Sequence, residues 1–518
     1  MNNSFRRLPI LLGVSLAILA CGGESPSRRA SVDRDRLVVA FDASPTHLDS
    51  RVGNDQNSGR MFDLIYSGLV KLNPSGRYDP DIAERWELAD EKTLVFHLRA
   101  DAKFHDGTAV TARDVAFTFE SLMEPGFPGP KSAGYSDVDS IETPDERTVI
   151  MHLRAPNAGF FDNLTLGILP HGADPDAYRT TPIGAGPYRV VEFLPDEKVE
   201  LEAFEEFHGG TPPIRYLTIR VIPDATTRVL ELRRGSVDFT LNTIPFDNVR
   251  QLENDPKLEI VADPGAIYQY LAFNLRHRAL RDLRVRRAIA HAIDRERIVR
   301  DLLLGFGRVT ESLLPPSHWA FAEGLPSFGY DLEKARELLD EAGYPDPDGD
   351  DGPAPRLALT YKTSTDVEAG LQAEMIQGML KEVGIDVTIQ SNEFGVFYDD
   401  ITKGNFELFS LRRAGVVDPD FYTYMFHSTN IPPNGQNRGY YINPKIDELL
   451  DRGRVIFDEE ERKEVYAEIQ RILAEDLPYV SLYHRSNVAI MNRGLENFKM
   501  YPSGFLLSLP ETRWRRNE

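Results

Sequence analysis

The chain has 518 residues, 41% of them hydrophobic and 27% charged, which is ordinary for a globular protein and too long for one core. Its net charge of −22 opposes binding to nucleic acid phosphates and to anionic lipid headgroups. With a single cysteine, Cys21, the chain forms no internal disulfide, and a lipidated Cys21 would leave no thiol for a metal site or a nucleophile.

The N-terminus has the pattern of a secretory signal peptide. Two arginines precede an apolar run from Leu8 to Ala20, which is too short to span a bilayer. Because Cys21 stands where cleavage is expected, the residues from Ile18 to Cys21 resemble a bacterial lipobox, although Leu19 is bulkier than the usual residue there. An ordinary signal peptide with an incidental cysteine, or an uncleaved signal anchor, is the alternative.

We therefore predict a signal peptide over residues 1–20 and a polar tether over 21–35 that begins with a lipidated Cys21. Removal of two arginines with the signal would leave a mature charge of −24. The protein would be a lipoprotein of the cell envelope, extracytoplasmic and held to a membrane only by its N-terminal lipid.

Predicted strands and helices alternate along the remaining chain. Hydrophobic periodicity predicts strands over 36–41, 93–99, 147–153, 187–193, 198–204, 215–222 and 268–274, and helices over 59–69, 282–303, 331–342, 366–383, 443–456 and 459–476. Leu94, Phe96 and Leu98 should share one strand face. Thr111 should cap a helix, with Asp114 completing a capping box. The fold class is α/β, in two or three domains.

A search for catalytic chemistry is mostly negative. The chain has no nucleophile elbow, phosphate-binding loop or zincin motif. The acidic run from Asp346 to Gly352 is similar to a calcium loop, but Asp351 and Leu357 stand where glycine and a bidentate glutamate belong. We predict no catalytic residue, metal site or cofactor.

Several segments resemble a known family. Ala83-Glu84-Arg85-Trp86 and the run from Leu94 to Thr108, continued by Thr111 to Val115, resemble the signature of family 5 bacterial extracellular solute-binding proteins. These are the dipeptide-, oligopeptide- and nickel-binding components of ABC importers. Residues 182–188, 273–274, 283–288, 292–295, 330–344 and 380–387 match further family segments in the same order, so that the resemblance covers Leu37 to Leu509.

The resemblance implies a two-lobed fold like that of class II periplasmic binding proteins, with an additional inserted domain and a two-strand hinge. Domain I would comprise 36–72, 184–265 and 490–518, domain II 73–183, and domain III, the second lobe, 266–489. Ligand would bind between the lobes, and hinge closure would bury it.

The function that this resemblance implies is capture of a peptide or peptide-like small solute and its delivery to the permease and ATPase of an ABC transporter. The protein would not be an enzyme, would bind no nucleic acid, and is expected to be a monomer. Two alternatives remain open: an extracytoplasmic hydrolase acting on peptide or glycan, and a binding subunit for a chemoreceptor.

One departure from the family pattern concerns the ligand's amino terminus. In peptide-binding members an aspartate in a second-lobe loop pairs with that amine, and alignment on Asp418 places Gly415 at its position. Three interpretations remain: Asp418 takes the role, Arg412 or Arg413 selects an anionic ligand, or the ligand lacks a free amine and binds by shape and backbone contacts.

Further candidates for ligand contact come from loops at predicted strand ends, where binding residues concentrate. They are Thr46, Leu48, Asn242, Tyr270, Asn274, Trp319 and Tyr422. For the aromatic residues the alternative is core packing, and for Asn274 it is a turn.

Overall fold

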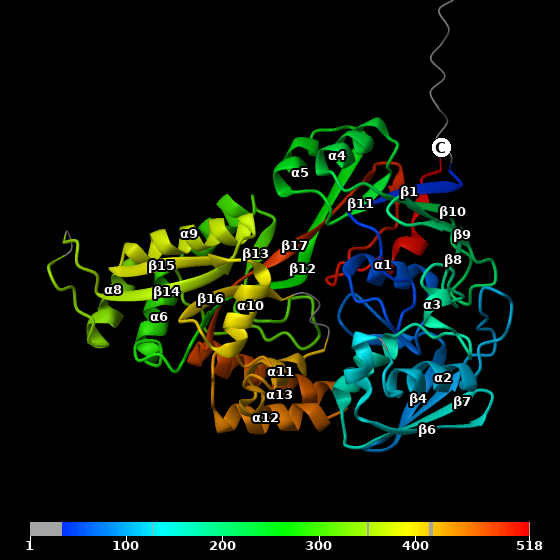
Figure 1. Ribbon diagram of the computed structural model, residues 1–518, viewed down its shortest axis with the longest axis horizontal. Helices are drawn as coiled ribbons and strands as arrows, with labels where there is room; N and C mark the ends of the chain where they lie inside the picture. The colour runs from blue at the N-terminus through cyan, green and yellow to red at the C-terminus, as the bar shows by residue number, and fades with distance from the viewer. Residues whose placement is uncertain (1–33, 128, 350–351, 414–417, 517–518) are drawn as a thin grey trace, which may run out of the picture. The chain divides into compact units, whose positions relative to one another are not determined.

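The computed structural model describes residues 34–516 except 128, 350, 351 and 414–417, and from Asp35 onward the chain forms one compact unit (Figure 1). The predicted signal peptide, Cys21 and nearly all of the predicted tether lie outside the described residues.

The largest element is a mixed sheet whose main order is β15-β14-β16-β12-β17-β11-β1-β10-β9-β8, with β13 also paired to β17. Its strands are β1 Arg36–Phe41, β8 Tyr188–Leu194, β9 Lys198–Ala203, β10 Tyr216–Val221, β11 Phe239–Leu241, β12 Leu258–Phe273, β13 Gly307–Val309, β14 Leu357–Ser364, β15 Ile385–Asn392, β16 Leu408–Arg413 and β17 Tyr479–Asn492. β1 is parallel to β10 and β11, and β14 is parallel to β15 and β16.

Two long antiparallel strands, β12 and β17, connect the two ends of this sheet. They pair from Leu258 with Asn492 to Ala272 with Tyr479, and Figure 1 shows them side by side. Their register shifts between Pro264 and Ile267. At that shift a Cβ on Gly265 would lie 2.7 Å from the carbonyl oxygen of Arg485, so the close approach of the strands requires glycine.

The β1 end of the sheet has its own core. Leu37, Val39 and Phe41 alternate on one face of β1 and pack with Met61 and Leu64 of α1, Gln56–Ile65. The small strands β18 Leu495–Glu496 and β19 Arg513–Trp514 pair nearby. The indole nitrogen of Trp514 donates to the carbonyl oxygen of Arg36 over 3.2 Å, which joins the last strand to the first.

A separate antiparallel sheet, β4-β5-β7-β6, lies in the segment predicted as an inserted domain. Just before it, β2 Val70–Leu72 and β3 Tyr78–Pro80 form a two-stranded sheet of their own. The elements that follow are β4 Ala83–Asp90, β5 Thr93–Leu98, α2 Ala112–Met123, the 3₁₀ helix η1 Pro130–Tyr135, β6 Val138–Asp145, β7 Thr148–Leu153, the 3₁₀ helix η2 Ala158–Thr165 and α3 Pro175–Tyr178. Leu94, Phe96 and Leu98 are buried on one face against Phe119 of α2, as their alternation predicts.

His105 connects this segment to the chain that returns to the main sheet. Its Nδ1 accepts from the backbone nitrogen of Gly184 over 3.2 Å, and its Nε2 lies 3.1 Å from the oxygen of Gly186. These roles require a neutral ring with the proton on Nε2. Burial favours the same form, because it lowers the pKa of His105 to about 4.

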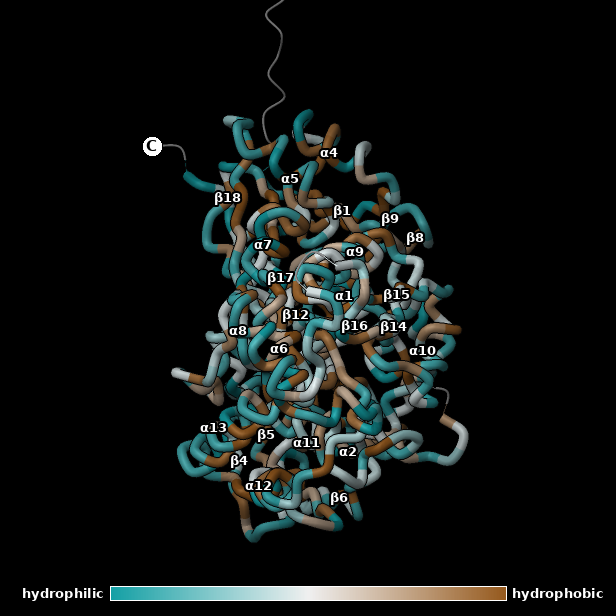
Figure 2. Tube along the Cα trace, turned by 90° about the vertical axis from the view of Figure 1, so that its left-hand side faces the viewer, coloured by the Kyte–Doolittle hydropathy of each residue, from teal (hydrophilic) through white to brown (hydrophobic). Residues whose placement is uncertain are grey.

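Helices cover the β14–β16 end of the main sheet. These and the remaining elements are α4 Ala225–Arg234, α5 Phe246–Leu252, α6 Leu283–Ala292, α7 Arg295–Arg297, a π-helical turn Ile298–Leu302, α8 Leu332–Glu341, α9 Val367–Lys381, α10 Phe394–Lys403, α11 Phe421–Phe426, η4 Ser428–Asn430, α12 Pro444–Val455, α13 Glu459–Asp476 and η5 Leu509–Glu511. One core runs from α4 and α5 to α8 and α9, and a second lies among β16, α11, α12 and α13. Figure 2 shows hydrophilic residues on outer turns, including α13.

Several sequence expectations are confirmed and others need correction. The backbone nitrogen of Thr111 donates to Asp114 over 2.8 Å, so the predicted capping box is present. The helix predicted over 282–303 is wrong as one unit, because it ends at Ala292 and restarts with Asp294 as N-cap. The helix predicted over 59–69 lies at Gln56–Ile65, and the strand predicted over 268–274 is the end of the longer β12.

Candidate ligand-binding site

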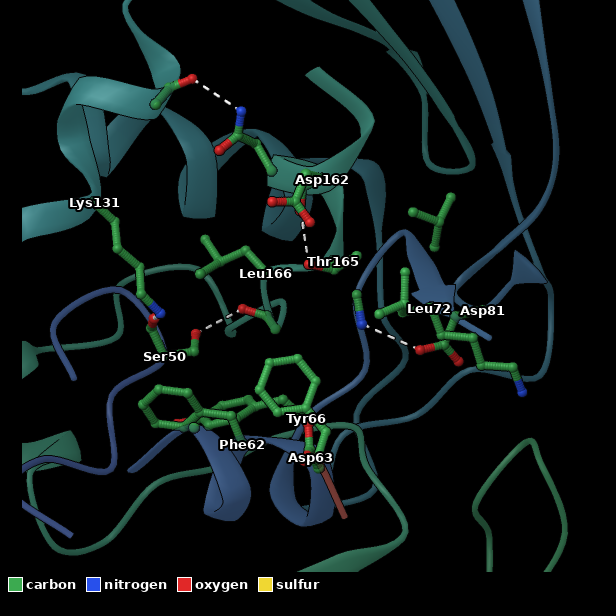
Figure 3. A pocket seen from close by; sticks show the side chains of 18 of the residues that line it. Ser50, Phe62, Asp63, Tyr66, Leu72, Asp81, Lys131, Asp162, Thr165 and Leu166 are labelled. Atoms are coloured by element: carbon green, nitrogen blue, oxygen red, sulfur yellow. Dashed lines mark hydrogen bonds between the residues drawn. The ribbon is translucent and has the colours of Figure 1, made fainter. Parts of the chain in front are cut away.

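A cavity of about 490 Å³ lies between α1, the residues that enter β2, η1, η2 and a C-terminal loop (Figure 3). Its volume is in the range of small-molecule sites. Its walls are formed by Ser50, Gly59, Phe62, Asp63, Tyr66, Gly68, Val70, Lys71, Leu72, Asp81, Pro130, Lys131, Gly134, Tyr135, Asp162, Asn163, Thr165, Leu166, Gly167, Phe505 and Leu507.

One side of α1 forms a wall of this cavity. Gly59, Phe62, Asp63 and Tyr66 are spaced three, four and seven residues apart, which places them on one helical face. The Tyr66 hydroxyl donates to the oxygen of Leu48 over 2.7 Å and fixes the ring. The wall is therefore largely aromatic, with one carboxyl group in it.

Lys131 brings a positive charge to the cavity from η1. Its ammonium donates to the oxygen of Ser50 over 2.6 Å and lies 4.9 Å from the ring centre of Phe62. Burial lowers the pKa of Lys131 to about 8, although the carboxylate of Asp49 acts in the opposite direction. Asp49 itself is paired with Arg51 in the interior over 2.7 Å.

Two carboxyl groups face the cavity from different elements. Asp63 of α1 accepts from the backbone nitrogen of Leu506 over 2.7 Å, and burial raises its pKa to about 7. Asp162 of η2 has an exposed side chain that protein atoms of the cavity walls surround, and this enclosure, with the nearby Asp418, raises its pKa to about 7. A third carboxylate, Asp81, is already bound to His208 over 2.7 Å.

The inserted segment carrying η2 contacts the part of the chain from α11 to α13. A Cβ on Gly159 of η2 would lie 3.2 Å from Oδ1 of Asp418. Nearby, Arg77 pairs with Glu459 of α13 over 2.6 Å. The backbone nitrogen of Trp319 donates to Ser75 over 2.9 Å. Asp162 thus lies near the contact between these two parts of the chain.

A second cavity, of about 340 Å³, lies at the carboxyl ends of β14 and β16. Arg412, an anion-binding candidate, lines it, but its guanidinium lies 3.2 Å from Glu368 and 3.8 Å from Asp366. Glu368 also pairs with Arg485 over 2.6 Å. The charge of Arg412 is therefore balanced within the protein.

Three predicted contact residues are core residues in the structure. Leu48 is completely buried, and Tyr270 and Tyr422 are each 2% exposed. Tyr270 stacks against Tyr479 with ring centres 4.8 Å apart. The two tyrosines therefore have the core packing that was the alternative to ligand contact. None of the three residues lines the 490 Å³ cavity.

Three polar candidates hold turns. Asn242 has a left-handed φ of 56° and bridges to Asn487 and to the backbone of Val488, both over 2.8 Å. Asn274 donates to the oxygen of Phe406 over 2.8 Å. Thr46 is exposed and its backbone nitrogen donates to Ser58 over 3.0 Å.

Asp418 is committed to an internal ion pair. Its two carboxylate oxygens accept from Nη2 and Nη1 of Arg462 over 2.7 and 2.9 Å, and both side chains are buried. Trp319 lies on the same arginine, with its ring centre 5.7 Å from the guanidinium carbon. Arg413 lies 4.4 Å from the ring centre of Phe421, and burial lowers its pKa. Gly415 lies outside the described residues.

Sequence reasoning missed Lys131, Asp63 and Asp162. Lys131 lies in a Pro- and Gly-rich segment that indicates only a break, and Asp63 lies among the apolar residues of a predicted helix. For these three residues the one available signal in the sequence was Asp63, a polar residue on an apolar helix face. Among the described side chains, no group of three or more His, Cys, Asp or Glu residues is arranged to hold a metal ion. No helix in the described part of the chain has the length and apolar character to span a bilayer.

Comparison with known proteins assigns the family. The profile described as "Bacterial extracellular solute-binding proteins, family 5 Middle" matches residues 77–433, more than half of the chain. The chain belongs to this family. The resemblance seen in the sequence is thereby confirmed.

Individual relatives of this family 5 protein bind different solutes. It is 29% identical to the oligopeptide-binding protein AppA of Bacillus subtilis (strain 168), over 97% of each chain. The structure of AppA in complex with a nonapeptide matches with a TM-score of 0.73 at 28% identity, over 93% of this chain and 99% of AppA. A probable di/tripeptide-binding protein 5 of Pseudomonas aeruginosa (strain UCBPP-PA14) is 28% identical, over 90% of this chain and 94% of its own.

NikZ from Campylobacter jejuni in complex with Ni(L-His) matches with a TM-score of 0.74 at 26% identity, over 93% of this chain and 100% of NikZ. The two-lobed α/β fold of the binding proteins is confirmed by these matches. The family and its relatives are solute-binding proteins rather than enzymes.

Proposed function

We propose that this protein captures a peptide outside the cytoplasm and delivers it to the permease and ATPase of an ABC importer. The observation that carries the proposal is a roomy cavity lined by both aromatic and charged side chains, in a chain whose relatives include oligopeptide- and di/tripeptide-binding proteins. Such a cavity suits a ligand with varied side chains and a small number of fixed polar ends.

The proposal includes the division into lobes. Domain I comprises 36–72, 184–265 and 490–518, domain II 73–183, and domain III 266–489, with β12 and β17 as the connecting strands. Binding draws the lobes together around the peptide. Most residues of the β1-end core belong to domain I and most of the inserted segment's core to domain II, which supports these two domains, whereas α4 and α5 share a core with domain III.

It also includes a lipid anchor at Cys21 and a monomeric state. Acyl chains on a terminal cysteine keep the binding protein near the membrane, which raises its effective concentration at the permease. We expect wild-type protein in the membrane fraction of the producing cell and Cys21→Ala protein in the soluble or retained precursor fraction. Equal fractionation of both forms would remove the anchor from the proposal.

The ligand class is tested by mass spectrometry of small molecules that co-purify with the native protein and are released by denaturation. Recovery of peptides supports the proposal, and calorimetry with the recovered peptides then measures their affinity. Recovery of a different solute class with no measurable peptide binding would replace it. Cleavage of the bound peptide by purified protein would favour a hydrolase.

A further inference from the structure

The 490 Å³ cavity contains an acidic side chain with no internal partner. Within the described part of the chain, the carboxylate of Asp162 takes part in no hydrogen bond or ion pair, and the group that acts on it is another acid, Asp418. By contrast, Asp81 in the same cavity is bound to His208, and Asp418 is neutralised by Arg462. Asp162 is therefore the carboxylate with capacity for a ligand cation.

The position of Asp162 in the fold bears on which group of the ligand it would bind. Asp162 lies on η2, which contacts Asp418, and Asp418 follows the segment that contains Gly415, where an amine-binding acid was expected. Asp162 therefore supplies a negative charge beside the contact between η2 and Asp418. On the α1 wall of the cavity, Asp63 supplies a second carboxyl group with a single backbone donor, Leu506.

The positive charges of the cavity are Lys71 of β2, which is exposed, and Lys131. The cavity's Lys131 is held by the oxygen of Ser50 and the ring of Phe62, so it is fixed on one wall. The protein's net charge of −22 attracts cations and slows the approach of anions. A ligand ammonium would replace the missing partner of Asp162 in an enclosed site, where such pairing is stronger than in water.

Building on the peptide-binding function proposed above, we propose that Asp162 binds the positively charged group of the peptide, with Asp63 as a second acceptor. The cation is either the free amino terminus or a lysine or arginine side chain. The peptide's charged end is accordingly recognised by the inserted domain rather than by the loop around Gly415.

Calorimetry on the purified full-length protein tests this with three probes: trialanine, N-acetyl-trialanine, and N-acetyl-Ala-Lys-Ala. We expect wild type to bind trialanine at least about tenfold more tightly than its acetylated form, and Asp162→Asn to abolish that difference, since a charge-assisted hydrogen bond is lost. Recovery of affinity with N-acetyl-Ala-Lys-Ala would assign the site to a basic side chain, and its absence to the amino terminus. Asp139→Asn, which removes an exposed charge from the same domain outside the cavity, is the matched control.

Three results would overturn the inference. An unchanged preference for trialanine in Asp162→Asn removes Asp162 while leaving the peptide-binding function intact. An equal loss of all three probes in a variant with wild-type thermal unfolding assigns Asp162 a structural role; should Asp162→Asn not fold, Asp162→Ser is measured in its place. Failure of wild type to bind any probe or co-purified peptide removes the proposed function, and the inference with it.

Discussion

Asp418 and Arg462 form a buried ion pair with two hydrogen bonds, of 2.7 and 2.9 Å, between the loop before α11 and the helix α13. The pair fixes the position of Asp418 next to η2. The sequence left open whether Asp418 anchors the ligand. The ion pair with Arg462 gives this acid a structural role instead.

Asp418→Asn should lower the free energy of unfolding by about 3–5 kcal/mol, because it leaves the buried guanidinium of Arg462 without a counter-charge. Chemical denaturation measures the loss. Asp418→Asn/Arg462→Met should regain part of it. A large drop in peptide affinity with unchanged stability would instead identify Asp418 as the amine anchor.

Peptide affinity should depend on pH in a narrow range. Enclosure raises the pKa of Asp162 and of Asp63 to about 7, so both are increasingly protonated below that pH and bind a cation less well. Above about 8 the amino terminus of the peptide loses its own proton. Calorimetry from pH 5 to 9 should therefore show strongest binding of trialanine near neutrality.

The acetylated peptide and Asp162→Asn provide the controls for this pH profile. N-acetyl-trialanine should bind with little dependence on pH, because it brings no cation to the cavity. Asp162→Asn should show a weaker acid limb with trialanine. An identical acid limb in the variant would assign the dependence to another group.

His484 should make the protein less stable in acid. Its side chain is 1% exposed in β17, and its Nε2 lies 3.0 Å from the oxygen of Ser312. Burial lowers its pKa to about 4, below the value of about 6.5 in the unfolded chain, so the folded state favours the neutral ring. The free energy of unfolding is therefore unaffected by this group above pH 6.5. It decreases by on the order of 3 kcal/mol as the pH falls toward 4, because the unfolded chain then takes up a proton that the folded state does not. His484→Gln should show a shallower decline in unfolding temperature between pH 7 and 4.

Gly184 should be intolerant of any side chain. A Cβ there would lie 2.0 Å from the carbonyl oxygen of Ile65, and the backbone on both sides is held by His105. We expect Gly184→Ala to cost roughly 1–3 kcal/mol, as overpacking does. Gly370→Ala in α9 is the matched substitution, because a Cβ at that position would meet no atom within 4 Å, and it should be neutral or stabilising by up to about 1 kcal/mol. Thermal unfolding of the two variants compares them directly.

The local pattern of hydrophobic and capping residues predicted the elements that bury only one face. The alternation of Leu94, Phe96 and Leu98 placed β5 and its buried face correctly, and Thr111 with Asp114 marked the start of α2. β17 was missed because it lies in the middle of the main sheet with most residues buried on both faces, which leaves no alternation to detect.

The cavity was beyond such patterns for a different reason. Asp63, Lys131 and Asp162 come from α1, η1 and η2, separated by up to about a hundred residues, and each is surrounded in sequence by residues that suggest a break or a helix. The partner of Asp418, Arg462, likewise lies 44 residues away. Contacts of this kind depend on tertiary packing, which composition and periodicity do not encode.

The bond from the Trp514 indole to the oxygen of Arg36 places the two ends of the folded unit beside each other. A fluorophore attached after residue 516 would therefore sit at the root of the N-terminal segment. If Cys21 carries lipid, that fluorophore reports how far the folded unit stands from the bilayer surface, and energy transfer to a labelled membrane would reveal how the unit shifts when it engages its permease. The same proximity makes this end of the molecule a poor place for a bulky tag.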